Sequence, residues 1–205
     1  MAGRYALFRW NREFAELPGF PAQHGPRYNL APGGQVLILR EDAGQRRLDL
    51  ARWGLTPAWL TDLSRTPAHA RAETLAEQPM FRDAFARRRC LLPVNGFYEW
   101  RGVRKRPHWV AGSQALSWLA AVWEAYPVQG HTYLSVAMVT QAAADQRRPL
   151  LLDDEADRQT WLAADTPLPR LLSLLARPQP SLRERALANL VNDPKLDGPE
   201  CLTPA

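Results

Sequence analysis

The sequence is poor in cysteine and contains no long apolar run. Its two cysteines, Cys90 and Cys201, lie far apart and show no paired spacing, which fits a reducing compartment better than a disulfide framework. No segment approaches the roughly 18 consecutive apolar residues of a membrane-spanning helix, and the N-terminal residues lack the charged and apolar regions of a signal peptide. We therefore expect a cytoplasmic protein without a membrane partner, in which both thiols are buried.

Lysine is almost absent, since only Lys105 and Lys195 belong to the 26 basic residues. Arginine therefore supplies nearly all of the positive charge, and the formal net charge is +5. A guanidinium group binds phosphate with two parallel hydrogen bonds and stacks on bases, so this excess favours a nucleic-acid partner. Codon composition is the alternative explanation, because alanine, leucine and proline are also abundant.

Histidine is scarce as well. His24, His108 and His131 show none of the spacings of metal ligands, and we predict that they are surface or turn residues. We therefore expect neither a metal ion nor another cofactor.

The length and composition predict one domain over residues 1–205, because 205 residues of which 46% are hydrophobic can bury a single core. Apolar or alternating runs predict strands at Gln35–Arg40, Arg46–Arg52, Arg89–Val94, Gly96–Arg101, Ala115–Trp123 and Thr132–Thr140. Glu41–Gly44 predicts a hairpin turn between the first two strands. Helical patterns occur at Asn11–Leu17, at Met80–Arg88, from about Asp153 onward, at Leu168–Leu175 and at Leu182–Leu190. Strands with helices segregated around them indicate an α+β fold.

One charged residue interrupts an aromatic segment. Glu99 lies within Phe97–Trp100, which we expect to be largely buried. Burial raises the pKa of a carboxyl group toward the range that suits proton transfer, so Glu99 is a candidate general acid or base. A structural ion pair, with Arg101 or Arg71 as the partner, is the alternative interpretation.

Two further patterns suggest recognition of a nucleic acid. Arg71 and Glu73 are two residues apart and would face the same side of a strand, which favours a joint role. Trp53 and Trp59 flank a segment with glycine and proline, and an aromatic ring beside a rigid turn can stack on an unpaired base for about 1–3 kcal/mol. Burial of both rings in the core is the alternative. We expect at least one ring to face nucleic acid, Trp59 before Trp53.

Five motifs occur in an order and at separations that resemble one protein family. They lie at Tyr28–Pro32, Trp53–Trp59, His69–Thr74, Gly96–Trp100 and Val191–Lys195. Together they resemble the SOS response-associated peptidase (SRAP) family, whose members recognise abasic sites in single-stranded DNA. The resemblance implies a compact, barrel-like, mainly antiparallel β core with peripheral helices.

The resemblance also implies roles for individual residues. Glu99 matches the family's catalytic glutamate, Ala2 stands at the position of its nucleophile, and Thr140 begins the stretch that leads to its catalytic histidine. The implied DNA contacts are Arg4, Asn29, Pro32, Trp53, Trp59, His69, Arg71 and Arg147.

Three positions depart together from the family's pattern. Ala2 replaces the nucleophilic cysteine, and His69 replaces an asparagine. Histidine can still hydrogen-bond a phosphate or a sugar, but it is bulkier and titrates near neutral pH. The loop that carries the catalytic histidine is shortened, so that Asp145 is the only titratable residue near that position, just ahead of Arg147.

We expect a divergent SRAP protein that binds abasic sites in single-stranded DNA as a monomer. Removal of Met1 would expose the Ala2 amine, whose ordinary pKa of about 7.7–8.0 allows a reversible Schiff base with the abasic aldehyde. A non-catalytic DNA-binding or regulatory relative is the second hypothesis. A peptidase, as the family name suggests, is the third, because the cysteine at position 2 is missing and no Ser-His-Asp set is evident.

Overall fold

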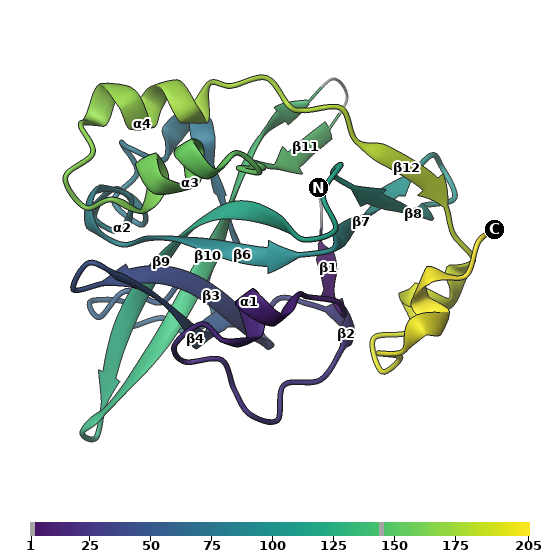
Figure 1. Ribbon diagram of the computed structural model, residues 1–205, viewed down its shortest axis with the longest axis horizontal. Coiled ribbons are helices and arrows are strands. Elements are labelled where there is room, and N and C mark those ends of the chain that lie inside the picture. Colours follow the sequence, from purple (N-terminus) through teal and green to yellow (C-terminus); the bar gives the residue numbers. More distant parts are fainter. Residues whose placement is uncertain (1–2, 144–145) are drawn as a thin grey trace.

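The computed structural model describes residues 3–143 and 146–205 (Figure 1). Its strands are β1 (Arg4–Leu7), β2 (Arg27–Leu30), β3 (Gln35–Asp42), β4 (Gln45–Trp53), β5 (His69–Arg71), β6 (Arg89–Val94), β7 (Gly96–Arg101), β8 (Arg106–Ala111), β9 (Ser117–Val128), β10 (His131–Ala143), β11 (Gln146–Pro149) and β12 (Arg183–Ala186). Its helices are α1 (Arg12–Ala15), α2 (Arg82–Arg87), α3 (Glu155–Leu162) and α4 (Leu168–Leu175), with 3-10 helices η1 (Ala72–Thr74), η2 (Asn189–Asn192) and η3 (Pro199–Leu202).

Five strands close into a barrel in the order β10-β4-β3-β6-β9, since β9 pairs again with β10. The β4–β10 contact is parallel and limited to two pairs, Ser135 with Arg52 and Val136 with Trp53. The other ladders of the barrel are antiparallel. The strands β5 and β11 attach to β10, β5 in parallel and β11 antiparallel. The predicted α+β fold with a barrel-like, mainly antiparallel core is confirmed.

The hairpin of β3 and β4 forms as the sequence predicts. Its register runs from Gln35 opposite Arg52 to Asp42 opposite Gln45. The two turn residues, Ala43 and Gly44, have φ angles of 49° and 78°, which suit a two-residue turn that follows the right-handed twist of the strands. Ala51 and Trp53 alternate with exposed Leu50 and Arg52 and lie in the barrel core, and Leu48 is buried as well.

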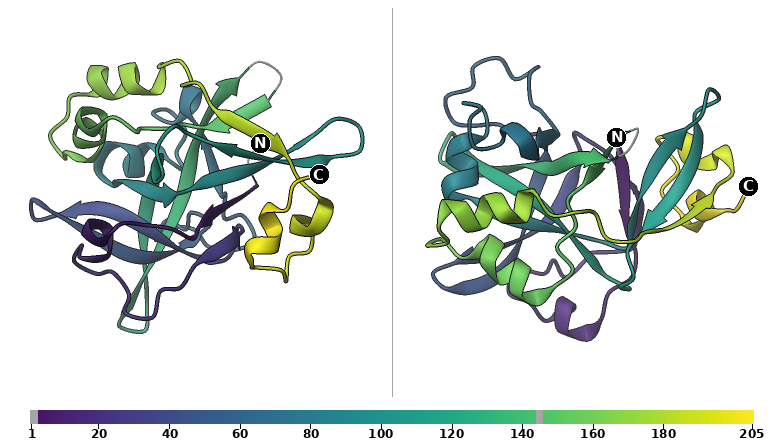
Figure 2. Two further views of the ribbon diagram at one scale, coloured as in Figure 1. Left: turned by 45° about the vertical axis from the view of Figure 1, so that its right-hand side comes forward. Right: turned by 90° about the horizontal axis from the view of Figure 1, so that it is seen from above.

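A second sheet, in the order β12-β8-β7-β1-β2, extends from the barrel where β6 passes into β7 (Figure 2). Asn95 at this junction is 6% exposed, and its side-chain oxygen accepts hydrogen bonds from the backbone N–H groups of Phe8 and Arg9. The next residue, Gly96, has to be glycine because a Cβ atom there would lie 2.4 Å from the ring of Trp109. The junction therefore fixes the position at which β7 leaves the barrel.

The helices α2, α3 and α4 lie together beside the barrel (Figure 1), and Arg89 joins two of them. This side chain donates to the backbone carbonyl oxygens of Phe85 and Ala86 in α2, at 2.8 and 2.7 Å. It also donates to those of Trp161 and Ala163 at the end of α3, both at 2.6 Å. Carbonyl groups at a helix C-terminus lack partners within the helix, so the buried guanidinium satisfies both ends. Burial lowers the pKa of Arg89 from its ordinary value.

Two local predictions are wrong. The segment Leu182–Leu190 is not a helix, because Arg183–Ala186 form strand β12 against β8 and η2 begins only at Asn189. Glu73 lies in η1 rather than on β5, so Glu73 and Arg71 do not share a strand face. Strands β1, β2, β8 and β11 were not predicted. β1, β2 and β11 have only four residues each, and β8 and β11 pair with the preceding strands β7 and β10.

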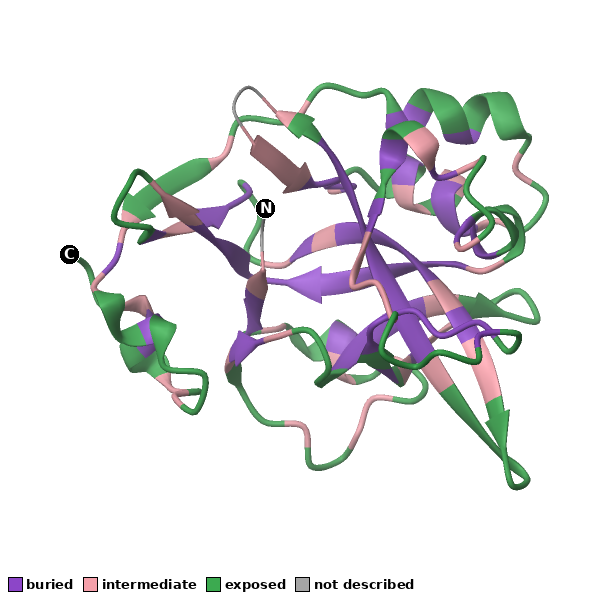
Figure 3. Cartoon of the chain, turned by 180° about the vertical axis from the view of Figure 1, so that it is seen from behind, coloured by how far each residue is buried: buried purple, intermediate pink, exposed green. Residues whose placement is uncertain are grey.

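Burial follows this architecture. Buried residues gather on the barrel strands, whereas β12 and the tip of the β9–β10 hairpin are exposed (Figure 3). None of the helices in the described ranges is long and apolar enough to cross a membrane.

Candidate functional site

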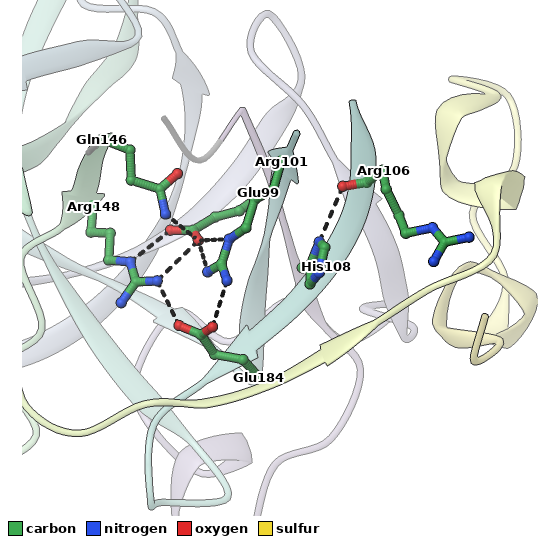
Figure 4. A network of polar contacts seen from close by, with 7 residues as sticks. All are labelled: Glu99, Arg101, Arg106, His108, Gln146, Arg148 and Glu184. Carbon is green, nitrogen blue, oxygen red and sulfur yellow. Dashed lines mark hydrogen bonds and ion pairs between the residues drawn. The ribbon is translucent and has the colours of Figure 1, made fainter. Parts of the chain in front are cut away.

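Glu99, near the end of β7, is the centre of a charged cluster (Figure 4). It is completely buried, with 0% exposure. Arg148 donates from Nε to one carboxylate oxygen at 2.9 Å. Gln146 donates to the other oxygen at 2.7 Å, and Arg101 donates to it from Nε at 3.1 Å. Two guanidinium groups therefore compensate the buried carboxylate, as a charge in the protein interior requires.

The cluster contains the ion pair that was the alternative interpretation of Glu99. Arg101 is a partner of the carboxylate, and Arg148 is a second one that the sequence did not indicate. Arg71 takes no part in it. A catalytic role for Glu99 stays a prediction.

Glu184 on β12 completes the cluster from the solvent side. Its carboxylate accepts hydrogen bonds from Nη1 of Arg101 at 2.6 Å and from Nη2 of Arg148 at 2.5 Å. These bonds, that from Arg101 above all, lower the pKa of Glu184 to about 2, although burial opposes the shift. We call Glu99, Arg101, Gln146, Arg148 and Glu184 the Glu99 cluster.

The stability of the protein is expected to depend on Glu184 below about pH 4.5. Because its pKa is lower in the folded state than in the unfolded chain, its contribution is complete above that pH and is lost as the pH falls toward about 2. Solvent screening limits the effect to about 1 kcal/mol. Thermal unfolding between about pH 6 and pH 3 should show a smaller loss of Tm for Glu184→Gln than for the wild type. Parallel curves would contradict the assignment.

The start of β1 lies beside the same end of β7. Arg4 pairs with Tyr98 across the antiparallel β1–β7 ladder. Gly3 is the first described residue, and a Cβ atom on it would lie 4.0 Å from the ring of Trp100. The chain therefore enters β1 next to the Glu99 cluster. Ala2, the predicted position of the reactive amine, lies outside the described residues, as does Asp145.

Arg147 faces the other side of β11, because neighbouring side chains of a strand point in opposite directions. It donates to the carboxylate of Glu73 at 2.6 Å, to the carbonyl oxygen of Thr140 at 2.7 Å and to the Thr140 hydroxyl at 3.2 Å. Burial alone would raise the pKa of Glu73, but the hydrogen bonds from Arg147 and from the backbone N–H of Ala142 lower it below its ordinary value. Thr140 is completely buried. Arg147 and Thr140 thus form a second cluster.

Strand β5 and the nearby tryptophans differ in accessibility. Arg71 is exposed, and its guanidinium has no hydrogen bond or ion pair within the described part of the chain. His69 is partly buried, and its ring lies edge-to-face with that of Trp53 at 5.6 Å. Trp53 is 1% exposed and donates its indole N–H to the carbonyl oxygen of Ala68, so no base can stack on it. Trp59 is 57% exposed, so its ring is accessible, and its contact with DNA stays a prediction.

Asn29 and Arg4 make contacts inside the protein. The side-chain amide of Asn29 donates to the backbone carbonyl oxygens of Val191, Asp193 and Leu196. Its side-chain oxygen accepts from Arg4 at 3.2 Å, and the guanidinium of Arg4 lies 5.5 Å from the ring centre of Trp100. Asn29 therefore holds the C-terminal segment in place. Pro32 is exposed in a turn. DNA contacts by these residues stay predictions.

The two cysteines and His108 are not part of the Glu99 cluster. Cys90 and Cys201 are both buried, as predicted, and burial raises the pKa of each thiol. His108 lies within β8 rather than in a turn, with Nδ1 3.1 Å from the carbonyl oxygen of Arg106 (Figure 4). Among the described residues, no group of His, Cys, Asp and Glu side chains could hold a metal ion.

Sequence reasoning missed Gln146, Arg148 and Glu184. Strand alternation in Gln146–Pro149 could have separated Arg148 from Arg147, had the short strand been predicted. Nothing local in Arg183–Ala186 indicates that Glu184 reaches β7, because that contact depends on the pairing of β12 with β8.

The family model of the SOS response associated peptidases (SRAP) matches residues 1–194. This chain belongs to that family. The resemblance inferred from five motifs is thereby confirmed, and the match also covers the residues before and between them.

Curated relatives match over most of this SRAP chain. The abasic site processing protein YoqW of Bacillus subtilis is 30% identical over 224 residues, which cover 98% of this chain and 99% of YoqW. The abasic site processing protein YedK of Escherichia coli is 30% identical over 181 residues, 79% of either chain. The abasic site processing protein HMCES of Gallus gallus is 25% identical over 246 residues, 98% of this chain and 70% of HMCES.

Solved structures share the fold. A protein from Bacteroides thetaiotaomicron superposes with a TM-score of 0.78 at 20% identity, over 90% of this chain and 88% of its own. A protein from Bordetella bronchiseptica superposes with a TM-score of 0.75 at 21% identity, over 91% and 99%. At identities of 20% and 21%, these structures show a shared fold and nothing further.

Proposed function

We propose that this SRAP protein binds abasic sites in single-stranded DNA and has at most weak Schiff-base chemistry. The observation that carries the proposal is a completely buried carboxylate, Glu99, at the end of β7 beside which the chain enters β1. The relatives named abasic site processing proteins support the same substrate. Exposed Arg71 and Trp59 supply groups of the kinds that bind a phosphate and stack on a base.

The proposed reaction uses the Ala2 amine after removal of Met1. The amine nitrogen attacks the carbon of the ring-opened aldehyde, and its two protons pass in turn through Glu99 to the former carbonyl oxygen, which leaves as water. An imine remains, and hydrolysis can reverse it. Because Ala2 has no thiol, no second bond can close the adduct into a stable ring. The balance of these steps requires one group that accepts and returns a proton, the role assigned to Glu99.

A non-catalytic DNA-binding protein is the second candidate, and one observation favours it. Both oxygens of Glu99 already accept hydrogen bonds from arginine side chains, and Gln146 donates to one of them. Proton transfer would require one of these bonds to open. A peptidase stays the third candidate, because position 2 carries alanine in place of the nucleophilic cysteine.

Arg71→Ala is expected to weaken binding to an abasic single-stranded oligonucleotide and to reduce the salt dependence by about 0.7 in slope, the equivalent of one phosphate contact. Fluorescence anisotropy against salt concentration measures both, and the duplex should bind more weakly than the single strand. Arg170→Ala on α4 is the matched control, since Arg170 is also exposed and without a partner in the described ranges. Negligible affinity for every form of DNA at low salt would refute the proposed function.

A further inference from the structure

An open cleft borders the Glu99 cluster. Its volume is about 690 Å³, and Arg148 and Glu184 lie on its wall beside the end of β10 and residues 176–182. Arg177 also lines the cleft, with a side chain that is 53% exposed. A strand of DNA laid along this cleft would therefore meet the cluster at Glu184.

The two carboxylates of the cluster are not equivalent. Glu99 is completely buried beneath the arginines, whereas the side chain of Glu184 is 30% exposed. Glu99 balances one of the two guanidinium charges from inside, and Glu184 balances the other from the solvent side. Because the formal charges cancel, the folded cluster presents no net positive charge to a ligand.

The geometry at Glu184 is that of an anion site. One guanidinium N–H group of Arg101 and one of Arg148 converge on its carboxylate, at 2.6 and 2.5 Å. A phosphate group presents two non-bridging oxygens to arginine donors in a similar way. A carboxylate of the protein itself thus occupies the position where two arginines from different strands could hold one phosphate.

We propose that Arg101 and Arg148 form a binding site for one backbone phosphate of DNA, and that Glu184 occupies this site until DNA displaces it. The proposal rests on the proposed function, since it assigns a DNA contact beside Glu99. Glu184 then lowers the affinity for every strand and restricts tight binding to those that offer enough other contacts. When DNA binds, the two arginines lose their charge-assisted hydrogen bonds to Glu184 and gain similar bonds to the phosphate. This exchange reduces the net free energy of binding.

Strand β12 does not need the Glu184 carboxylate in order to stay in place. Four residue pairs join it to β8, from Arg183 opposite Ala111 to Ala186 opposite His108. The guanidinium of Arg183 also donates to the carbonyl oxygen of Gly112 at 2.9 Å. A substitution at Glu184 should therefore change the charge of the site and leave its frame intact.

Glu184→Gln is expected to bind an abasic single-stranded oligonucleotide about three- to tenfold more tightly than the wild type at low salt. The slope of affinity against salt should steepen by about 0.7, since one more phosphate is held in an uncompensated site. Glu184→Asp keeps the charge but is one methylene shorter, so it should bridge the two arginines poorly and show an intermediate affinity. The measurement is fluorescence anisotropy, with a thermal melt of each variant.

Glu155→Gln is the matched control. Glu155 is also held by two arginines, Arg46 and Arg158, each at 2.6 Å, but it lies on α3 outside the cleft. Its substitution removes the same charge and should leave the affinity within about twofold of the wild type. Equal gains in Glu155→Gln and Glu184→Gln would reduce the effect to net charge and overturn the proposal.

Neutral methylphosphonate linkages, placed one at a time along the oligonucleotide, identify the phosphate. The difference in affinity between wild type and Glu184→Gln should vanish when the neutral linkage replaces the phosphate that the arginines bind. It should persist when the neutral linkage is at any other position. Inorganic phosphate as competitor tests the other source of the anion: competition with the oligonucleotide at equal phosphate concentration would assign the site to a free ion and overturn the DNA contact.

The failures of the two proposals differ. If the wild type and every variant fail to bind DNA, the proposed function is refuted. If the wild type binds and Glu184→Gln binds equally or more weakly, the phosphate site is refuted, and Glu184 only positions the arginines around Glu99.

Discussion

Glu99→Gln is expected to slow borohydride trapping of abasic DNA by about 10²–10⁴-fold, the usual contribution of a positioned acid–base group. Glutamine has the size of glutamate and retains an oxygen that can accept from Arg101 or Arg148, but it cannot transfer a proton. DNA affinity should change by no more than about tenfold. Quantified denaturing gels over time give the trapping rate, and anisotropy gives the affinity.

Trapping must also depend on the amine. Borohydride delivers hydride to the imine carbon and leaves a secondary amine. Because retained Met1 would displace the α-amine by one residue, only protein without Met1 should form the trapped species. In the absence of borohydride, no band should survive heat and denaturant, because Ala2 has no thiol. A persistent band without reductant would identify another nucleophile.

Glu124→Gln is the control for the loss of a buried carboxylate. Glu124 on β9 is 8% exposed and pairs with Arg88 at 2.7 Å. The same chemical change there should leave trapping unaltered. If Glu99→Gln also leaves the rate unaltered, Glu99 is structural, and its ion pairs with Arg101 and Arg148 are the whole explanation. If the wild type traps no DNA, the non-catalytic candidate takes the place of the first.

Arg89→Met is expected to lower the free energy of unfolding by about 3–5 kcal/mol. Methionine keeps part of the apolar stem but leaves four backbone carbonyl groups at the ends of α2 and α3 without their donor. For a chain of this size the loss corresponds to roughly 6–20 °C in Tm. Chemical denaturation followed by circular dichroism measures it.

A neighbour of Arg89 isolates the effect of these bonds. Arg87 is exposed in α2 and has no side-chain partner in the described ranges, so Arg87→Met should change stability by at most about 0.5 kcal/mol. Arg89→Lys keeps the charge but has fewer donors, and should lie between the wild type and Arg89→Met. Similar stabilities for Arg87→Met and Arg89→Met would show that the helix ends do not depend on this guanidinium.

Local signals in the sequence predicted the parts of the fold that local chemistry determines. The hairpin around Ala43 and Gly44, the uniformly buried β6 and the helix Leu168–Leu175 all formed where expected. The segment Arg183–Ala186 did not, because its residues are not strand formers and only pairing with β8 makes them a strand.

In the candidate site, too, contacts between neighbouring residues were predictable and contacts over long separations were not. Glu99 was recognisable because a carboxylate inside an aromatic segment needs a compensating partner, and Arg101 is two residues away. Arg148 and Glu184 were not, since Arg148 reaches Glu99 from the other sheet and Glu184 reaches the arginines only through the pairing of β12 with β8. Asn29 matches a family motif, but a motif does not reveal that the side chain holds the C-terminal segment.

Strand β10 pairs with strands that contribute residues to both charged clusters. Strand β10 pairs with β9 and β4 in the barrel wall, with β5, which carries Arg71, and with β11, which carries Arg147 and Arg148. The spacing between these groups is therefore set by the backbone, whichever side chains occupy the positions. Evolution can exchange a side chain on these strands and alter the chemistry on offer, while the distances over which that chemistry must act are inherited unchanged.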